Sequence, residues 1–117
     1  MGIIAEQWIA DERVQLSVQR ATGLRRPLGL IGRAPPAAAT GLLLPRCRSV
    51  HGIGIRRPLD VVFIDAAGEA VAVRRLRRFG LASDLRARHV LEFAEGETAR
   101  LGIEPGMRLK NISAPEG

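Results

Sequence analysis

The chain is poor in cysteine and in aromatic residues. Its 117 residues include one cysteine, no tyrosine, three phenylalanines and one tryptophan. A single cysteine, Cys47, excludes an internal disulfide and dithiol redox chemistry, which agrees with a reducing compartment. The scarcity of aromatic side chains leaves little material for the base-stacking platform of typical single-strand nucleic-acid readers.

Long apolar runs are missing as well. No run is long enough to cross a bilayer, and residues 1–12 lack a basic region and contain acids before any apolar run of signal-peptide length. We therefore expect a soluble, cytoplasmic protein without a membrane span. An exported form remains an alternative if a leader has been removed.

The charge is strongly one-sided. The sequence has 18 Lys and Arg against 12 Asp and Glu, a formal net charge of +6, and Lys110 is the one lysine. Such an excess favours polyanionic partners, namely nucleic acid, an acidic membrane surface, or a small phosphate or carboxylate ligand. A GC-rich genome would also produce many arginines without any functional reason.

The length fits a single domain over residues 1–117, with a modest core that needs no metal or cofactor to fold. Residues 34–40, "APPAAAT", are the most linker-like stretch. Seven residues that join two elements are an ordinary loop, so we expect no domain boundary there.

Hydrophobic patterns predict a mainly β fold with some helix. A hairpin over residues 59–76 is the clearest element, because its first strand is apolar on both faces and residues 65–68 supply turn chemistry. Other strands are expected over residues 13–19, 41–44, 50–55, 89–93 and 107–112. Short helices are expected near residues 24–31 and 96–102.

About six short strands and two short helices without regular βαβ alternation favour one architecture. We expect a compact, strongly bent antiparallel sheet or small barrel. In the strand predicted over residues 50–55, alternation places His51 with Ile53 and Ile55 on the apolar face. Gly52 and Gly54 leave the other face bare, for a close neighbour, a ligand or a bulge.

Three stretches carry a resemblance to a known family: "PLGLIGR", then "RCRSVHGIGIRRPLDVVFIDAAGEAV", then "HVLEF" with "ARLGIEPG". Over about residues 14–110 the chain resembles the bacterial and archaeal family called domain of unknown function 192. The resemblance implies a compact, predominantly β fold with short helices and implies no activity. The chain departs from the family pattern at five positions, which alters any site built from them. They are Gly52, Ile53, Ile55, Ala94 and Met107.

Cys47 and His51 are candidates for a Cys–His nucleophile or a metal half-site. In an extended segment their Cα atoms would be about 13 Å apart, beyond hydrogen-bond reach, so packed strand residues are the better interpretation. Ser49, His51 and Asp60 could form a triad, but Ser49 lies in no nucleophile-elbow motif. We predict no catalytic residue, metal or cofactor.

Asp60 starts a strand that is apolar on both faces, so its carboxylate needs a donor. Arg56, Arg57, His51 or a backbone N–H could supply one, and a structural ion pair or strand-entry cap is the plain interpretation. Alternatively, His51 and Asp60 form the polar floor of a small pocket beside the two glycines. The candidate ligand-binding residues are His51, Asp60, Cys47, Arg56 and Arg57.

The stretch "RRLRR" over residues 74–78 continues the hairpin's second strand. Alternation places Arg75 and Arg77 on one face, and Arg74 and Arg78 on the other. Such a strand end can bind phosphates, although a charged edge strand guarded against aggregation has the same pattern.

Three functions remain open from the sequence. The leading hypothesis is a non-catalytic binding or accessory module for an anionic small ligand or a protein partner. The second is sequence-indifferent nucleic-acid binding through Arg74, Arg75, Arg77 and Arg78, with an affinity that falls steeply with salt. The third is an enzyme of unrecognised type, whose site would be assembled from residues far apart in the sequence.

Overall fold

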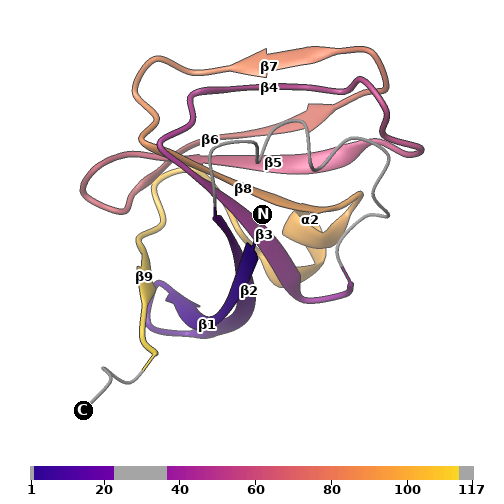
Figure 1. Cartoon of the computed structure of the whole chain (residues 1–117). Coiled ribbons are helices and arrows are strands. Elements are labelled where there is room, and N and C mark those ends of the chain that lie inside the picture. The colour runs from indigo at the N-terminus through magenta and orange to yellow at the C-terminus, as the bar shows by residue number, and fades with distance from the viewer. Residues whose placement is uncertain (1, 23–36, 114–117) are drawn as a thin grey trace.

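A computed structural model describes residues 2–22 and 37–113 (Figure 1). These ranges contain nine strands and one helix. The strands are β1 (Gly2–Ala10), β2 (Val14–Thr22), β3 (Thr40–Pro45), β4 (Ser49–His51), β5 (Leu59–Ile64), β6 (Ala70–Leu76), β7 (Leu81–Ser83), β8 (His89–Ala94) and β9 (Leu109–Asn111), and the helix is α2 (Glu97–Leu101). No helix in these ranges is long and apolar enough to cross a membrane.

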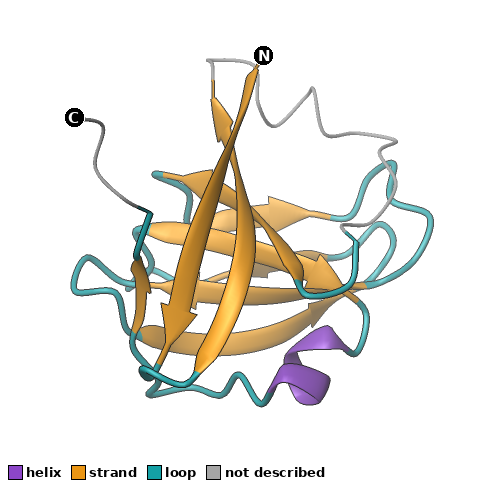
Figure 2. Ribbon diagram, turned by 90° about the horizontal axis from the view of Figure 1, so that it is seen from below, coloured by secondary structure: helices purple, strands orange, loops and turns teal. Residues whose placement is uncertain are grey.

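Seven strands form one strongly curled sheet, in the order β6-β5-β8-β3-β2-β1-β9, and β4 pairs with β7 in a separate two-stranded layer. Neighbouring strands are antiparallel except β2 and β3, which are parallel. Figure 2 shows the long β1–β2 hairpin crossing the other strands of the sheet. The predicted mainly β fold with a strongly bent sheet is confirmed.

The two edges of the curled sheet approach each other at the β5–β6 turn. Leu109 N–H donates to the carbonyl oxygen of Gly68, and Ala70 N–H donates to that of Met107, both at 2.8 Å. Because β9 also pairs with β1, the segment that leads into β9 links one edge of the sheet to the other. These bonds satisfy backbone groups that an open edge would leave unpaired.

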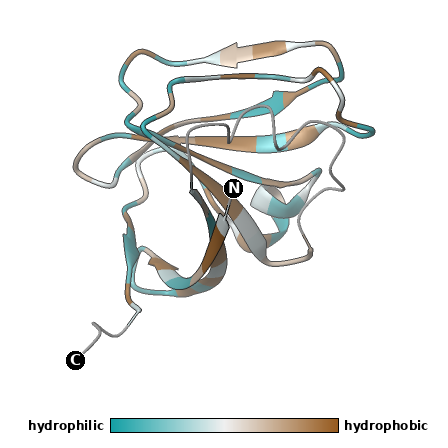
Figure 3. Ribbon diagram, in the orientation of Figure 1, coloured by the Kyte–Doolittle hydropathy of each residue, from teal (hydrophilic) through white to brown (hydrophobic). Residues whose placement is uncertain are grey.

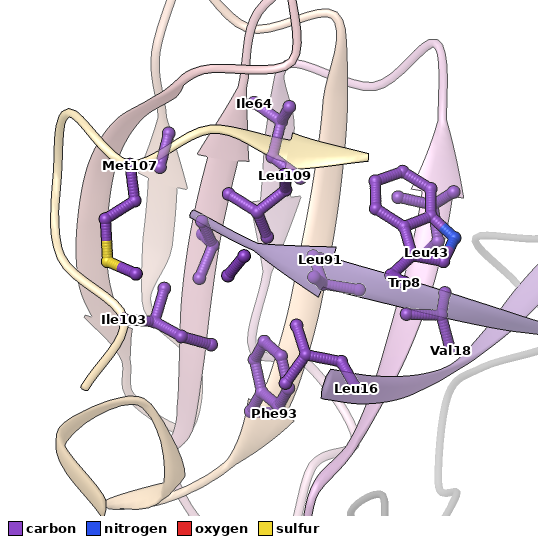
Figure 4. Close-up of a cluster of buried hydrophobic side chains, with 13 residues drawn as sticks. Trp8, Leu16, Val18, Leu43, Ile64, Leu91, Phe93, Ile103, Met107 and Leu109 are labelled. Atoms are coloured by element: carbon purple, nitrogen blue, oxygen red, sulfur yellow. The ribbon is translucent and has the colours of Figure 1, made fainter. Parts of the chain in front are cut away.

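Two hydrophobic clusters lie on the two faces of this sheet. The inner cluster takes residues from all seven strands, and Figure 4 shows Trp8, Leu91 and Phe93 among its members. The outer cluster lies between the sheet and the β4–β7 layer, which contributes Val50 and Ala82. Each face of the sheet therefore has its own apolar cover.

Most of the predicted strands are present. The hairpin of β5 and β6, the buried strand β3 and the strand β8 lie where the hydrophobic patterns place them. The prediction missed β1 and β7 and extended the last strand beyond the three residues of β9. The helix predicted near residues 24–31 and the first three residues of the loop over residues 34–40 lie outside the described residues.

The strand predicted over residues 50–55 is wrong beyond His51. β4 ends there, and within it Val50 is buried while His51 is exposed, so His51 does not share the apolar face. The chain turns because Gly52 packs against the connection between β6 and β7. Gly52 N–H donates to the Gly80 oxygen at 2.9 Å, and Phe79 N–H donates to the Gly52 oxygen at 3.0 Å.

Gly52 leaves no room for a side chain, since a Cβ there would clash with the backbone carbonyl of Arg77. Of the three possibilities expected for the bare glycines, a close neighbour, a ligand or a bulge, the structure shows a close backbone neighbour at Gly52.

We expect Gly52→Ala to lower the free energy of unfolding by about 1–3 kcal/mol, because the added methyl group must displace backbone atoms. Urea unfolding of the purified variant measures this difference. Gly2→Ala is the matched control, since its new Cβ meets only the flexible Thr22 side chain at a strand end. Equal unfolding midpoints for the two variants would contradict the packing argument.

Candidate anion-binding site

Two connections between the curled sheet and the β4–β7 layer run side by side at one end of the molecule (Figure 1). Residues 46–48 lead from β3 to β4, and residues 84–88 lead from β7 to β8. Backbone hydrogen bonds join the connections: Cys47 N–H donates to the Arg88 oxygen, and Asp84 N–H donates to the Arg48 oxygen, both at 3.0 Å. The two segments therefore hold each other in place.

An open depression of about 520 Å³ lies at this junction. It is lined by Arg46, Cys47, Arg48, Ser49 and Arg88. Three of its five lining residues are arginines, and all three are exposed.

These three arginines have no acidic partner in the described part of the chain. The nearby Asp84 carboxylate binds other arginines, with Arg86 at 2.8 Å and Arg74 at 3.8 Å. Hydrogen bonds from Arg86 lower the pKa of Asp84 to about 2, so Asp84 remains charged at neutral pH. Its charge is directed to Arg86 and Arg74, which leaves the depression positive.

His89 lies at the edge of this junction, and its pKa responds to the positive charges there. Its Nδ1 accepts a hydrogen bond from Arg46 N–H at 3.2 Å, so the imidazole acts as an acceptor. Burial, followed by the positive charges of Arg20, Arg88 and Arg46, lowers the pKa of His89. A neutral histidine here adds no further positive charge at neutral pH.

Cys47 is half-buried in the lining of the depression. Its Sγ lies 3.1 Å from the carbonyl oxygen of Ser49, to which the thiol can donate. Arg48 Nε donates to the Ala87 oxygen at 3.2 Å, which fixes one guanidinium at the rim. Guanidinium groups bind carboxylates and phosphates in a planar, two-point manner, so this arrangement suits a small anion.

His51 and Asp60 do not meet, which removes the pocket floor and the triad considered above. His51 lies on the exposed face of the β4–β7 layer, beyond the outer cluster. Asp60 lies on the same face of β5 as Val62 and Ile64, which belong to the inner cluster. The sheet therefore separates the two side chains.

Asp60 caps helix α2. Its Oδ2 accepts hydrogen bonds from the N–H of Thr98 at 3.0 Å and from the Thr98 hydroxyl at 2.7 Å, while Arg75 lies 3.5 Å from Oδ1. Gly96 at the helix N-cap has no side chain to bind these groups. The structural interpretation of Asp60 fits this geometry: one donor is a backbone N–H, as expected, and the others are the Thr98 hydroxyl and Arg75 rather than Arg56, Arg57 or His51.

The four arginines predicted within residues 74–78 differ in their surroundings. Arg74 is paired with Asp84, and Arg75 with Asp60 and Glu95. β6 ends at Leu76, so Arg77 and Arg78 follow the strand rather than continue its alternation. Together with Arg56 and Arg57 they lie at the end of the molecule away from the depression.

Of the residues that line the depression, Cys47 and Ser49 were considered from the sequence, but Arg46, Arg48 and Arg88 were not. The only local signal was that one arginine stands on each side of the cysteine. Arg88 is distant in the sequence, and no pattern indicates that it joins them. Within the described residues, no three His, Cys, Asp or Glu side chains are grouped as metal ligands.

A second buried acid, Glu92, was also missed. It faces the outer cluster from β8 and is 8% exposed, and its carboxyl group forms no hydrogen bond or ion pair with any described residue. Its neighbours in register on the adjacent strands are Leu42 and Val61. Burial raises the pKa of Glu92 to about 7.

Comparison with solved structures identifies the same fold in two other proteins. A Sinorhizobium meliloti protein described as a "putative transcription regulator" has 22% identity and a TM-score of 0.80, covering 95% of this chain and 96% of its own. A protein of unknown function from Novosphingobium aromaticivorans has 19% identity and a TM-score of 0.75, covering 92% and 84%. At these identities the likeness concerns the fold alone.

No curated protein is significantly similar in sequence to this chain. The model of a family of uncharacterised proteins, DUF192 (Uncharacterized ACR), matches residues 5–111. The match includes every residue that lines the depression.

Glu92 predicts a specific pH dependence of stability. Because the folded protein binds this proton more tightly than the unfolded chain, the free energy of unfolding falls as pH rises from about 4.5 to about 7. The contribution is roughly 3 kcal/mol across this window. We expect Glu92→Gln to remove it, as measured by urea unfolding at several pH values.

The exposed Glu104 provides the control, since Glu104→Gln makes the same chemical change away from the core. It should leave the pH dependence of the native chain unchanged. An identical pH profile for the native chain and Glu92→Gln would show that Glu92 does not titrate in this way.

Proposed function

The chain belongs to the DUF192 family of uncharacterised proteins, and we propose that it is a non-catalytic module that binds a small anion carrying phosphate or carboxylate groups. The observation that carries this proposal is the depression at the junction of the two connections. Three arginines line it, and none of them has an acidic partner among the described residues.

The backbone supports a binding role for these arginines. Arg46 and Arg48 lie on either side of Cys47, whose N–H is bonded to the Arg88 oxygen, so the three residues keep a fixed spacing. A preformed site loses less conformational entropy on binding than a flexible one. An anion would also relieve the repulsion among three neighbouring guanidinium groups.

Of the residues first considered for ligand binding, Cys47 belongs to this proposed site. His51 and Asp60 do not line the depression. Arg56 and Arg57 lie in the connection that follows β4, whereas the depression lies at the beginning of β4. The proposed ligand is therefore still an anion, but its proposed site differs from the one expected from the sequence.

Nucleic-acid binding through the arginines of residues 74–78 is less well supported. Arg74 and Arg75 have acidic partners, which leaves Arg77 and Arg78 to contact phosphates. A regulatory description of a protein with the same fold does not by itself favour it, because one fold serves many functions.

The sole cysteine offers a direct test of the proposed site. We expect inorganic phosphate or citrate to slow alkylation of Cys47 by iodoacetamide in a saturable way, because a bound anion covers the thiol. Arg88→Ala should weaken this protection at least about tenfold, as expected for the loss of a hydrogen bond to a charged group. Mass spectrometry of the modified protein gives the rates.

Arg13→Ala is the matched control. Arg13 precedes β2, and the parallel pairing of β2 and β3 places it at the opposite end of these strands from Arg46. This variant should keep full protection. Protection that is absent, does not saturate, or is equal in Arg88→Ala and the native chain would reject the proposed site.

A further inference from the structure

A separate cluster of exposed apolar side chains lies at the other end of the β4–β7 layer. Ile53 is 53% exposed, Phe79 70% and Leu81 74%. They are neighbours because Phe79 N–H donates to the oxygen of Gly52, and because Leu81 pairs with His51 across the two strands. We call Ile53, Phe79 and Leu81 the apolar tip.

Four arginines lie at the same end of the molecule as the apolar tip. Leu59 and Leu76 are partners in the β5–β6 register, so Arg57, two residues before Leu59, and Arg78, two residues after Leu76, lie at the same end of that hairpin. Arg56 and Arg77 are their chain neighbours. The guanidinium carbon of Arg78 lies 5.0 Å from the centroid of the Phe79 ring.

These arginines have no counterion in the part of the chain that the structure describes. All four are exposed, and the ion pairs of the described residues include none of them. In Figure 3 the connection from β4 to β5 passes from hydrophobic to hydrophilic residues as it turns around this end. Bulky apolar side chains and unpaired positive charges thus occupy the same connections.

Ile53 lies in the connection from β4 to β5 and Phe79 in the connection from β6 to β7, which turn at one end of the molecule (Figure 1), and Leu81 is the first residue of β7. Side chains exposed to this degree do not line a groove of the kind that holds a peptide or helix. A second copy of the chain would bring a further set of arginines against these four, which is unfavourable. Aliphatic Ile53 and Leu81 cannot stack on bases as an aromatic platform does.

The surface of a bilayer that contains anionic lipids complements both features. Apolar side chains enter the boundary between headgroups and acyl chains, while arginines remain at the level of the phosphates. We propose that the apolar tip and Arg56, Arg57, Arg77 and Arg78 form a surface that binds anionic membranes peripherally. This proposal is independent of the anion-binding depression.

Co-flotation with vesicles tests the surface. The protein should bind vesicles of equal parts phosphatidylcholine and phosphatidylglycerol, and bind phosphatidylcholine vesicles far more weakly. Arg77→Ala and Arg78→Ala should each reduce the affinity about fivefold. Phe79→Asn should reduce it about tenfold, and Asn tolerates the positive φ of 62° at this position.

Leu85→Asn is the matched control, because Leu85 is 87% exposed in the connection at the opposite end of the layer. It should bind vesicles as the native chain does. The three substituted side chains at this surface are exposed, and unchanged urea midpoints establish that each variant is folded.

Three results would overturn the proposal. The first is equal affinity, or no binding at all, for vesicles with and without phosphatidylglycerol. The second is an equal loss of affinity in Leu85→Asn and Phe79→Asn. The third is binding of a single-stranded oligonucleotide that Arg77→Ala and Arg78→Ala weaken, with no binding to either kind of vesicle, which would assign this surface to nucleic acid.

Discussion

The burial of β5 on both faces is the constraint on which the rest of the structure depends. All six of its residues are buried, with Val62 and Ile64 in the inner cluster and Val61 and Phe63 in the outer one. Apolar surface on two sides needs two covers. Curling of the sheet supplies the first, and the β4–β7 layer supplies the second.

The second cover determines where charge can gather. To build it, the chain must leave the sheet after β3 and return before β8, and these two connections meet at residues 46–48 and 84–88. At the other end of the layer, the chain must turn from β4 to β5 and from β6 to β7. Arginines occur in all four connections, so the same layer creates two basic regions at its opposite ends.

The two acids buried in the sheet illustrate different solutions to one energetic problem. Asp60 is compensated by Thr98 and Arg75, and in return it satisfies the beginning of a helix that has glycine at its N-cap. Glu92 has no such partner within residues 2–22 and 37–113, and its proton affinity rises instead. A buried carboxyl group must be either paired or protonated, and this sheet contains one of each kind.

The sequence by itself determined the elements whose side chains alternate along a short stretch. The β5–β6 hairpin, β3 and β8 follow from apolar runs with turn residues between them, because strand geometry is a local property of the chain. The same reasoning failed at His51, since alternation was extended past Gly52, where a backbone contact with residues 77–80 turns the chain. It missed β1, whose first residues are mostly exposed and show no clear alternation. Only the tertiary structure decided that Arg88 joins Arg46 and Arg48, and that the sheet separates His51 from Asp60. Both outcomes depend on pairing between distant segments, which no local pattern encodes.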